Sequence, residues 1–206
     1  MSGEYGCCTV SGQKRRNNLT PYECTKKRIL DRIRASEVPE DYHHALNTLK
    51  WVRKLHAKDD ALLEIAALGH DIERASAETK VRRSNFADYD SFKHAHAENS
   101  ANIVSQIMRE CNWDEVSIER VAGMIRNHET GGDRESNVLR DADALSFFEV
   151  NLPYYYKRHD LAEVEKRCRW GYSRISPKWK PFVRQFRYPD EELNRLIERI
   201  GASAVC

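Results

Sequence analysis

Apolar residues recur every three to four positions along most of this chain, which is the spacing of one face of an α-helix. No stretch alternates apolar and polar residues for more than a few positions, so no β-strand is predicted. A first helix is expected at LTPYECTKKRILDRI, where Thr20, Pro21 and Glu23 supply an N-cap, a first-turn proline and a capping-box acid. The pattern predicts further helices at residues 40–57, 60–71, 89–110, 114–128, 136–151, 160–175 and 189–200.

Polar segments rich in proline or glycine separate these helices, for example SEVPE and ETGGDRES. The longest one, RASAETKVRRSNFADYD, is a loop of a length that is often functional in compact domains. With 206 residues, 40% of them hydrophobic, the chain can bury one core. We therefore expect an all-α protein with a flexible tail at 1–19, a main helical domain at 20–151, and a helical extension at 152–206 that packs on the core.

Charge and cysteine content exclude some classes of protein. Lys and Arg number 34 against 32 Asp and Glu, so the formal net charge of +2 gives no global attraction to nucleic acid or membranes. No apolar run is long enough for a membrane span, and the N-terminus lacks the apolar segment of a secretory signal. The six cysteines show no metal-type spacing and are too sparse for a small disulfide-rich fold. These features favour a cytoplasmic protein.

Four predicted helices each carry one histidine on the apolar face. His43 shares its helical line with lysines, whereas His44 shares its line with Thr48, Trp51 and Leu55. The same comparison places three further histidines inward, namely His70, His96 and His128. A lone inward histidine is most often a core residue held by hydrogen bonds, and His56 fits that interpretation. Several imidazoles in one small core, however, are costly unless a metal ion binds their lone pairs.

Acidic residues accompany these histidines. Asp71 follows His70 directly, at the end of the most apolar stretch of the chain, LLEIAALGHDIERAS. Asp141 and Asp143, in LRDADALSFF, lie about 200° apart on a helix, so only one of them faces a shared site. Both have apolar neighbours on their helical lines, and the periodicity alone does not decide between them.

These residues resemble the HD-domain superfamily of metal-dependent phosphohydrolases, an all-helical fold named for adjacent His and Asp ligands. The resemblance covers about residues 40–151 and lies in DYHHALNTLKWV, AALGHDIERA and LRDADALSFFEV, with further histidines in HAENSANIV and IRNHE. It implies a helical bundle in which His44, His70, Asp71 and Asp143 bind a first metal ion, with Asp141 as the alternative to Asp143. It also implies that His96 and His128 complete a second metal position. The chain lacks the paired histidines of cyclic-dinucleotide phosphodiesterases.

The resemblance also implies a chemistry. A site of nitrogen and oxygen donors without thiolates suits Mn, Fe, Co, Ni or Zn, with one or two ions per chain. Such an ion polarises a phosphoryl oxygen and activates water for attack on a phosphate ester. Asp71 would orient the water, and Glu73 would act as the acid for the leaving group, although a solvated ion pair between Glu73 and Arg74 is the simpler interpretation.

Cations for an anionic substrate follow the His-Asp pair in the long loop. Arg74, Lys80, Arg82 and Arg83 are candidates for binding phosphate. Farther along, residues 157–187 hold ten Lys and Arg against three Asp and Glu, interleaved with aromatic residues. This pattern is compatible with a lid over a nucleotide, with an RNA-binding surface, or with aromatic residues packed on the core.

We therefore predict a metal-dependent phosphohydrolase, a phosphomonoesterase or phosphodiesterase, that acts on a nucleotide or another small phosphate ester. One alternative is a di-iron oxygenase of the HD type, which oxygen uptake would identify. The other is a non-catalytic metal-containing module that binds nucleotide or RNA, for which salt-dependent RNA binding without phosphate release would be diagnostic.

Overall fold

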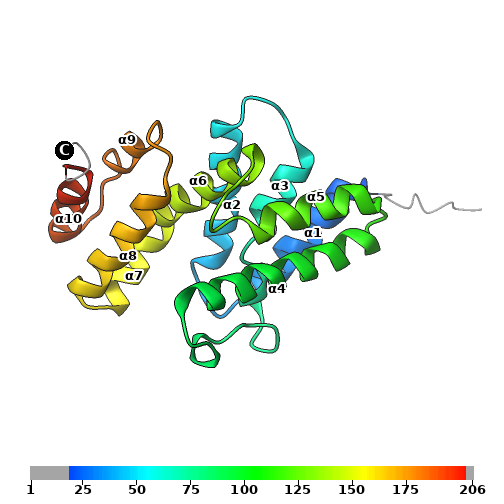
Figure 1. The fold of residues 1–206 in the computed structure, drawn as a ribbon, viewed down its shortest axis with the longest axis horizontal. Helices are drawn as coiled ribbons and strands as arrows, with labels where there is room; N and C mark the ends of the chain where they lie inside the picture. The colour runs from blue at the N-terminus through cyan, green and yellow to red at the C-terminus, as the bar shows by residue number, and fades with distance from the viewer. Residues whose placement is uncertain (1–18, 203–206) are drawn as a thin grey trace, which may run out of the picture.

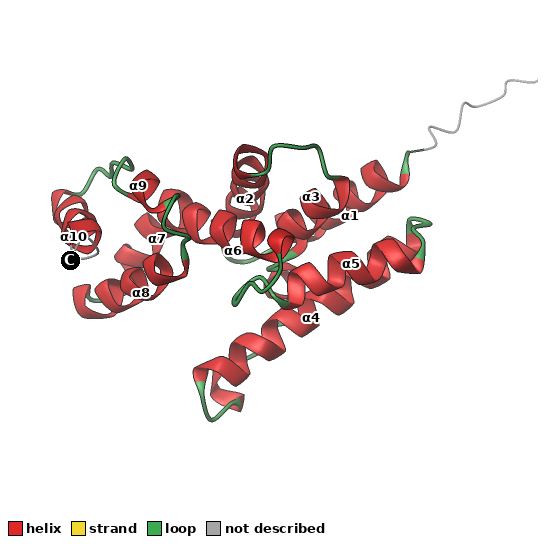
Figure 2. Cartoon of the chain, turned by 45° about the horizontal axis from the view of Figure 1, so that its top comes forward, coloured by secondary structure: helices red, strands yellow, loops and turns green. Residues whose placement is uncertain are grey.

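The computed structural model describes residues 19–202, which form helices joined by loops (Figure 1, Figure 2). No strand occurs within this range, so the predicted all-α class is confirmed. The expected tail at 1–19 lies almost entirely outside the described residues. The helical elements are α1 (Pro21–Arg34), α2 (Asp41–Leu55), α3 (Ala61–Gly69), η1 (Ile72–Ala75), η2 (Arg83–Asn85), α4 (Tyr89–Glu110), α5 (Glu115–Arg126), α6 (Arg134–Ser146), η3 (Phe147–Asn151), α7 (Leu152–Arg158), α8 (Leu161–Arg174), α9 (Lys180–Val183) and α10 (Glu191–Ala202).

Polar caps explain where the helices begin. Thr20 accepts a hydrogen bond from the main chain of Glu23, whose carboxylate accepts one from Thr20 in return, and the capping box predicted for α1 is thus present. Aspartates at the N-caps of α4, α5, α6 and α8 accept main-chain hydrogen bonds in the same way, at positions 88, 114, 133 and 160. Local sequence therefore sets most of the helix boundaries.

The helices form two groups on either side of α2 and α6. In Figure 1, α1, α3, α4 and α5 lie on one side, and α7 to α10 lie on the other. α2 packs on α3 and α6, while α6 also contacts α8. The ring of Trp51 on α2 packs at 5.4 Å from Phe182 and 6.1 Å from Phe186, measured between ring centroids. The partly buried rings of Phe182 and Phe186 thus pack against the core.

Two features of the C-terminal half differ from the expected elements. The helix expected at 136–151 begins earlier, at Arg134, because Asp133 caps it, and it passes at Phe147 into the π-helical turn η3. The chain then continues directly into α7, which the apolar pattern did not predict, with Pro153 in its first turn. The short α9 was also not predicted, because it is a single turn without its own apolar period.

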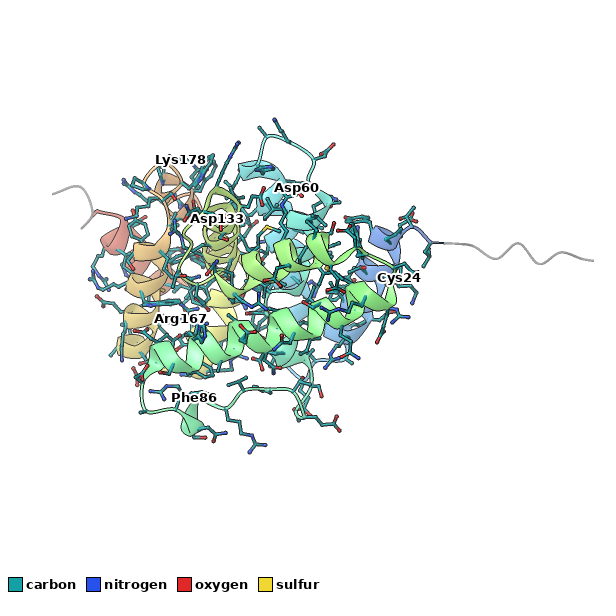
Figure 3. All side chains as sticks on the ribbon, turned by 45° about the vertical axis from the view of Figure 1, so that its right-hand side comes forward. Cys24, Asp60, Phe86, Asp133, Arg167 and Lys178 are labelled. Carbon is teal, nitrogen blue, oxygen red and sulfur yellow. A yellow bond between two sulfur atoms is a disulfide. The ribbon has the colours of Figure 1, made fainter. Side chains whose placement is uncertain are left out.

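Cys24 on α1 and Cys111 at the end of α4 form a disulfide across 87 residues (Figure 3). Spacing along the sequence gave no indication of this pair, because α1 and α4 become neighbours only in the fold. Among the remaining described residues Cys168 is a free, buried thiol. In the same range, no helix combines the length and apolar character needed to cross a bilayer.

Glu64 joins three helices, and its replacement by glutamine is expected to destabilise the protein. Arg53 donates to both carboxylate oxygens at 2.7 Å, and the Tyr22 hydroxyl donates a third hydrogen bond. These bonds, with that of Arg53 the largest cause, hold the pKa of Glu64 below its ordinary value of 4.5. We expect Glu64→Gln to lower the free energy of unfolding by about 1–3 kcal/mol at pH 7, measured by urea denaturation.

The pH dependence gives the control for this prediction. Because the folded-state pKa of Glu64 is depressed, its contribution is present above the unfolded pKa and is lost as the pH falls through the folded value. The stability difference between wild type and Glu64→Gln should therefore narrow between pH 5 and pH 3. A difference that stays constant over this range would contradict the proposed role of the ionised carboxylate.

Candidate metal centre

A close approach of α3 to α4 places His70 and Asp71 in the core. α3 ends at Gly69, where an added Cβ would lie only 2.5 Å from Cγ2 of Val104 on α4. Glycine thus allows α3 and α4 to come together at this position. His70 follows directly and is fully buried, whereas the side chain of Asp71 is 19% exposed and faces the centre of the site.

A first group of ligand atoms comes from α2, α3 and α6. Nε2 of His44 lies 3.1 Å from Nε2 of His70 and 3.2 Å from Oδ1 of Asp143. Nε2 of His70 lies 3.5 Å from the same carboxylate oxygen. Three donor atoms from three separate helices thus converge on one point and lie close enough together to bind a single ion.

A second group lies beside the first and shares Asp71 with it. Nε2 of His96 on α4 lies 2.8 Å from Oδ1 of Asp71, and Nε2 of His128 lies 3.9 Å from the same oxygen. The Asp71 carboxylate also lies 3.9 Å from Nε2 of both His44 and His70. Asp71 therefore lies between the two groups, within 3.9 Å of a ring nitrogen of all four histidines.

The outer ring nitrogens of these histidines are held by hydrogen bonds. Nδ1 of His70 lies 2.9 Å from the Ala67 carbonyl, and Nδ1 of His128 lies 2.7 Å from the Ile125 carbonyl. A carbonyl only accepts, so each Nδ1 carries a proton, and Nε2 is the ring nitrogen that faces the site. This second contact is the usual way in which proteins orient a histidine ligand toward a metal.

The unpartnered atoms of the site fit a metal ion. Nε2 of His128 is buried and makes no well-aligned hydrogen bond in the described part of the chain, although Oε1 of Glu129 lies 3.3 Å away. A buried lone pair without a partner costs free energy, and an ion would satisfy it. The donors are imidazole nitrogens and carboxylate oxygens without thiolate, a set that suits Mn, Fe, Co, Ni or Zn.

The carboxylates keep their negative charge in this buried site. Burial favours the neutral acid, but His70, Arg74 and His96 hold the pKa of Asp71 well below its usual range. His44 and His70, with Arg174, have the same effect on Asp143. Burial also disfavours charged imidazole, yet the two carboxylates raise the pKa of His70 to about 9. Without an ion, the site is thus held together by these charges.

Two residues at the site were not predicted from the sequence. Glu129 places Oε1 at 3.3 Å from Nε2 of His128, and with Asp143 these residues form a third group of ligand atoms. Arg174 lies 2.9 Å from Glu129 and 3.1 Å from Asp143. The signal for Glu129 was its adjacency to His128, which repeats the His-Asp order of the first pair. Nothing in the sequence distinguished Arg174 from its basic neighbours.

The structure also places the candidates that the sequence left open. Asp143 joins the first group, whereas Asp141 accepts a hydrogen bond from the main chain of Ser176 at 2.8 Å. His43 is exposed, as its helical line indicated, while His44 is 3% exposed. His56 is partly exposed and belongs to none of the ligand groups.

Glu73 is buried, and both of its carboxylate oxygens are occupied. Oε1 lies 2.6 Å from Nδ1 of His96, and Oε2 accepts from the main chain of Val81 at 2.6 Å. The surface ion pair with Arg74 is therefore not formed. Arg74 instead binds Asp71 at 2.7 Å and Asp41 at 3.2 Å.

The other predicted substrate-binding cations lie in different surroundings. Lys80 lines a cavity of about 280 Å³ that adjoins the ligand groups at His96. Arg83 lines a neighbouring cavity of about 470 Å³ and donates a hydrogen bond to the Phe86 carbonyl. Arg82 is exposed and lines neither of these cavities.

Fold and site together define an all-helical protein with a buried centre of histidines and carboxylates. Residues 19–197 match the model of a family described as a domain of unknown function, DUF4202, and the chain belongs to this family. Neither a curated protein nor a solved structure matches the chain.

Proposed function

We propose that this chain is a metal-dependent phosphohydrolase of the HD type that acts on a nucleotide or another small phosphate ester. The proposal rests on one observation, which is that two groups of ligand atoms meet at Asp71. His44, His70 and Asp143 form one of them, and His96 and His128 complete the other. These are the residues that the resemblance to HD-domain proteins implied.

When bound, a divalent ion in such a site supplies Lewis-acid activation of the phosphate and lowers the pKa of water toward neutrality. The residues of the chain contribute position and charge. Asp71 is held ionised and its side chain is 19% exposed, so it is suited to orient a water. In the reaction, a new P–O bond forms to water oxygen, the ester P–O bond breaks, and a proton passes to the leaving oxygen.

Glu73 is better suited to position His96 than to protonate a leaving group. Both of its oxygens are engaged, one by His96 and one by the main chain of Val81. A carboxylate on the outer nitrogen of a ligand histidine fixes the ring and increases its basicity. Glu73, which the sequence suggested as the leaving-group acid, therefore has no free carboxylate oxygen for that role.

Metal content followed by a substrate screen tests the proposed function. Protein purified without chelator is analysed for bound metals and then incubated with nucleotides and sugar phosphates in the presence of Mn, Co or Ni. We expect phosphate release that EDTA abolishes and added metal restores. Metal-bound protein that releases no phosphate from any substrate would contradict the proposal.

The two alternative functions predict different results in the same preparation. The paired ligand groups at Asp71 also suit the di-iron oxygenase alternative, which predicts oxygen uptake by the iron-loaded, reduced protein. A binding module predicts salt-dependent binding of RNA or nucleotide without turnover. Oxygen electrode and binding measurements therefore separate these functions from phosphate hydrolysis.

A further inference from the structure

The cavity beside the metal centre has excess positive charge on its wall. His96 and Glu73 belong to its lining, and the rest comes from the N-cap of α2, from η1 and the loop after it, and from α4, η3, α7 and α8. The cations on this wall are Arg74, Lys80, Lys93, Arg158 and Arg167, and the acids are Glu40 and Glu73. Tyr89, Tyr155 and Arg167 also line the wider neighbouring cavity of about 470 Å³, so the two cavities adjoin.

The acids of both cavities already have partners. Glu40 forms an ion pair with Arg158, Glu73 binds His96, and Glu163 accepts a hydrogen bond from the Tyr155 hydroxyl. Lys80 and Arg167, by contrast, have no carboxylate partner within residues 19–202. The wall therefore presents positive charge that the protein itself does not neutralise.

Arg167 is held rigidly where the two cavities meet. Its guanidinium carbon lies 4.3 Å from the ring centroids of both Phe147 and Trp170. Figure 3 shows Arg167 between α8 and the N-terminal half of α4. Its Nη1 atom is buried and has no hydrogen-bond partner in the described chain. A guanidinium that lines both cavities, is stacked on aromatic rings and has no carboxylate partner in the described chain is preorganised to bind an anion such as phosphate.

The π-helical turn η3 brings a second unpartnered group to the same wall. Phe147 and Asn151 belong to this turn, and both line the cavity beside the metal centre. Oδ1 of Asn151 is buried without a hydrogen-bond partner, again within the described chain. Single π-helical turns inside α-helices occur frequently at functional sites. Oδ1 of Asn151 and Nη1 of Arg167 thus both lack a hydrogen-bond partner in the described chain, and both residues line this cavity.

We infer that Arg167 binds a second anionic group of the substrate, in a subsite separate from the metal centre. This inference rests on the proposed function, because the phosphate that is hydrolysed would lie at the metal ligands. The substrate class is then a nucleoside that carries phosphates at two positions. Its base would lie against two aromatic side chains of the wall, Tyr89 and Phe92, and Asn151 would accept a hydrogen bond from the sugar or the base.

A matched pair of substrates tests this subsite. Hydrolysis of a nucleoside 5′-monophosphate is compared with hydrolysis of the corresponding 3′,5′-bisphosphate. For the wild type we expect kcat/KM to be about tenfold higher for the bisphosphate, as one charge-assisted contact provides. In Arg167→Met this ratio should fall toward one. Arg169→Met is the matched control, because Arg169 lies on the same helix but pairs with Glu165 outside both cavities.

Binding without turnover separates this inference from the proposed function. In EDTA, calorimetry should show tighter binding of the bisphosphate than of the monophosphate to the wild type and to Arg169→Met. The preference should be lost in Arg167→Met and reduced in Arg167→Lys, which keeps the charge but not the stacked plane. If no phosphate is released but this binding preference is found, the subsite stands and the proposed function fails. Equal binding of both ligands to the wild type, or a preference that persists in Arg167→Met, would overturn the inference.

Discussion

Replacement of His70 or Asp71 by alanine should abolish metal-dependent phosphate release. His70 donates Nε2 to the first ligand group, and Asp71 lies between both groups, so each substitution removes a ligand at the centre of the site. Because a bound ion supplies several kcal/mol of transition-state stabilisation, we expect kcat/KM to fall by roughly 10³-fold or more. Phosphate release and metal content are measured together on each variant.

His43→Ala is the matched control for this experiment. His43 neighbours His44 on α2 but is exposed and belongs to no ligand group, so this variant should keep its metal and its activity. Circular dichroism should show that all variants remain helical, since the apolar packing around α3 is unchanged. Loss of activity in His43→Ala with full activity in His44→Ala would show that the metal centre lies elsewhere.

Two metal ions per chain are expected in protein saturated with Mn or Fe. His44, His70 and Asp143 suffice for one ion, while His96 and His128 form a separate group on the other side of Asp71. His96→Ala and His128→Ala should each reduce the metal content toward one ion per chain and lower the activity. Elemental analysis after dialysis against the free metal measures the stoichiometry.

A different result would indicate that His96 and His128 bind the substrate and not a second metal ion. If the wild type never exceeds one ion at saturation, and His96→Ala and His128→Ala keep that ion while KM rises, these histidines bind phosphate in a mononuclear enzyme. Glu73→Gln provides an additional comparison, because Glu73 touches His96 and none of the other ligand histidines. In a two-metal site this variant should weaken the second ion selectively, by about 10- to 100-fold in affinity.

The positions of residues around each helix, deduced from the 3.6-residue period, explain which site residues could be predicted from the sequence. The neighbours of His43 and His44 on their helical lines differ, and the structure buries His44 and exposes His43 as the pattern indicated. The same phase did not decide between Asp141 and Asp143, because both have apolar neighbours. That choice depends on the main chain of Ser176, which binds Asp141 from a distant part of the chain.

The features that sequence did not reveal all depend on long-range contacts. Arg174 reaches Asp143 and Glu129 from α8, and Arg167 stacks on Phe147 across the same interface. Each is one of several arginines in a basic segment, and only the three-dimensional contacts distinguish it from its neighbours. The π-helical turn at Phe147 likewise has no apolar period of its own to distinguish it from an ordinary helix.

The disulfide between Cys24 and Cys111 would link the redox state of the chain to the lifetime of an ion at the proposed metal centre. The segment that it closes contains His44, His70, Asp71 and His96. A disulfide lowers the entropy of the unfolded chain, and an ion that binds only the folded state lowers the free energy of that state. Both effects shift the folding equilibrium toward the folded protein. Reduction of the disulfide is expected to make opening of the fold more frequent, and each opening would separate the ligand residues and release a bound ion. The cysteine pair that joins α1 to the C-terminal end of α4 would thus set how long an ion stays at the proposed centre.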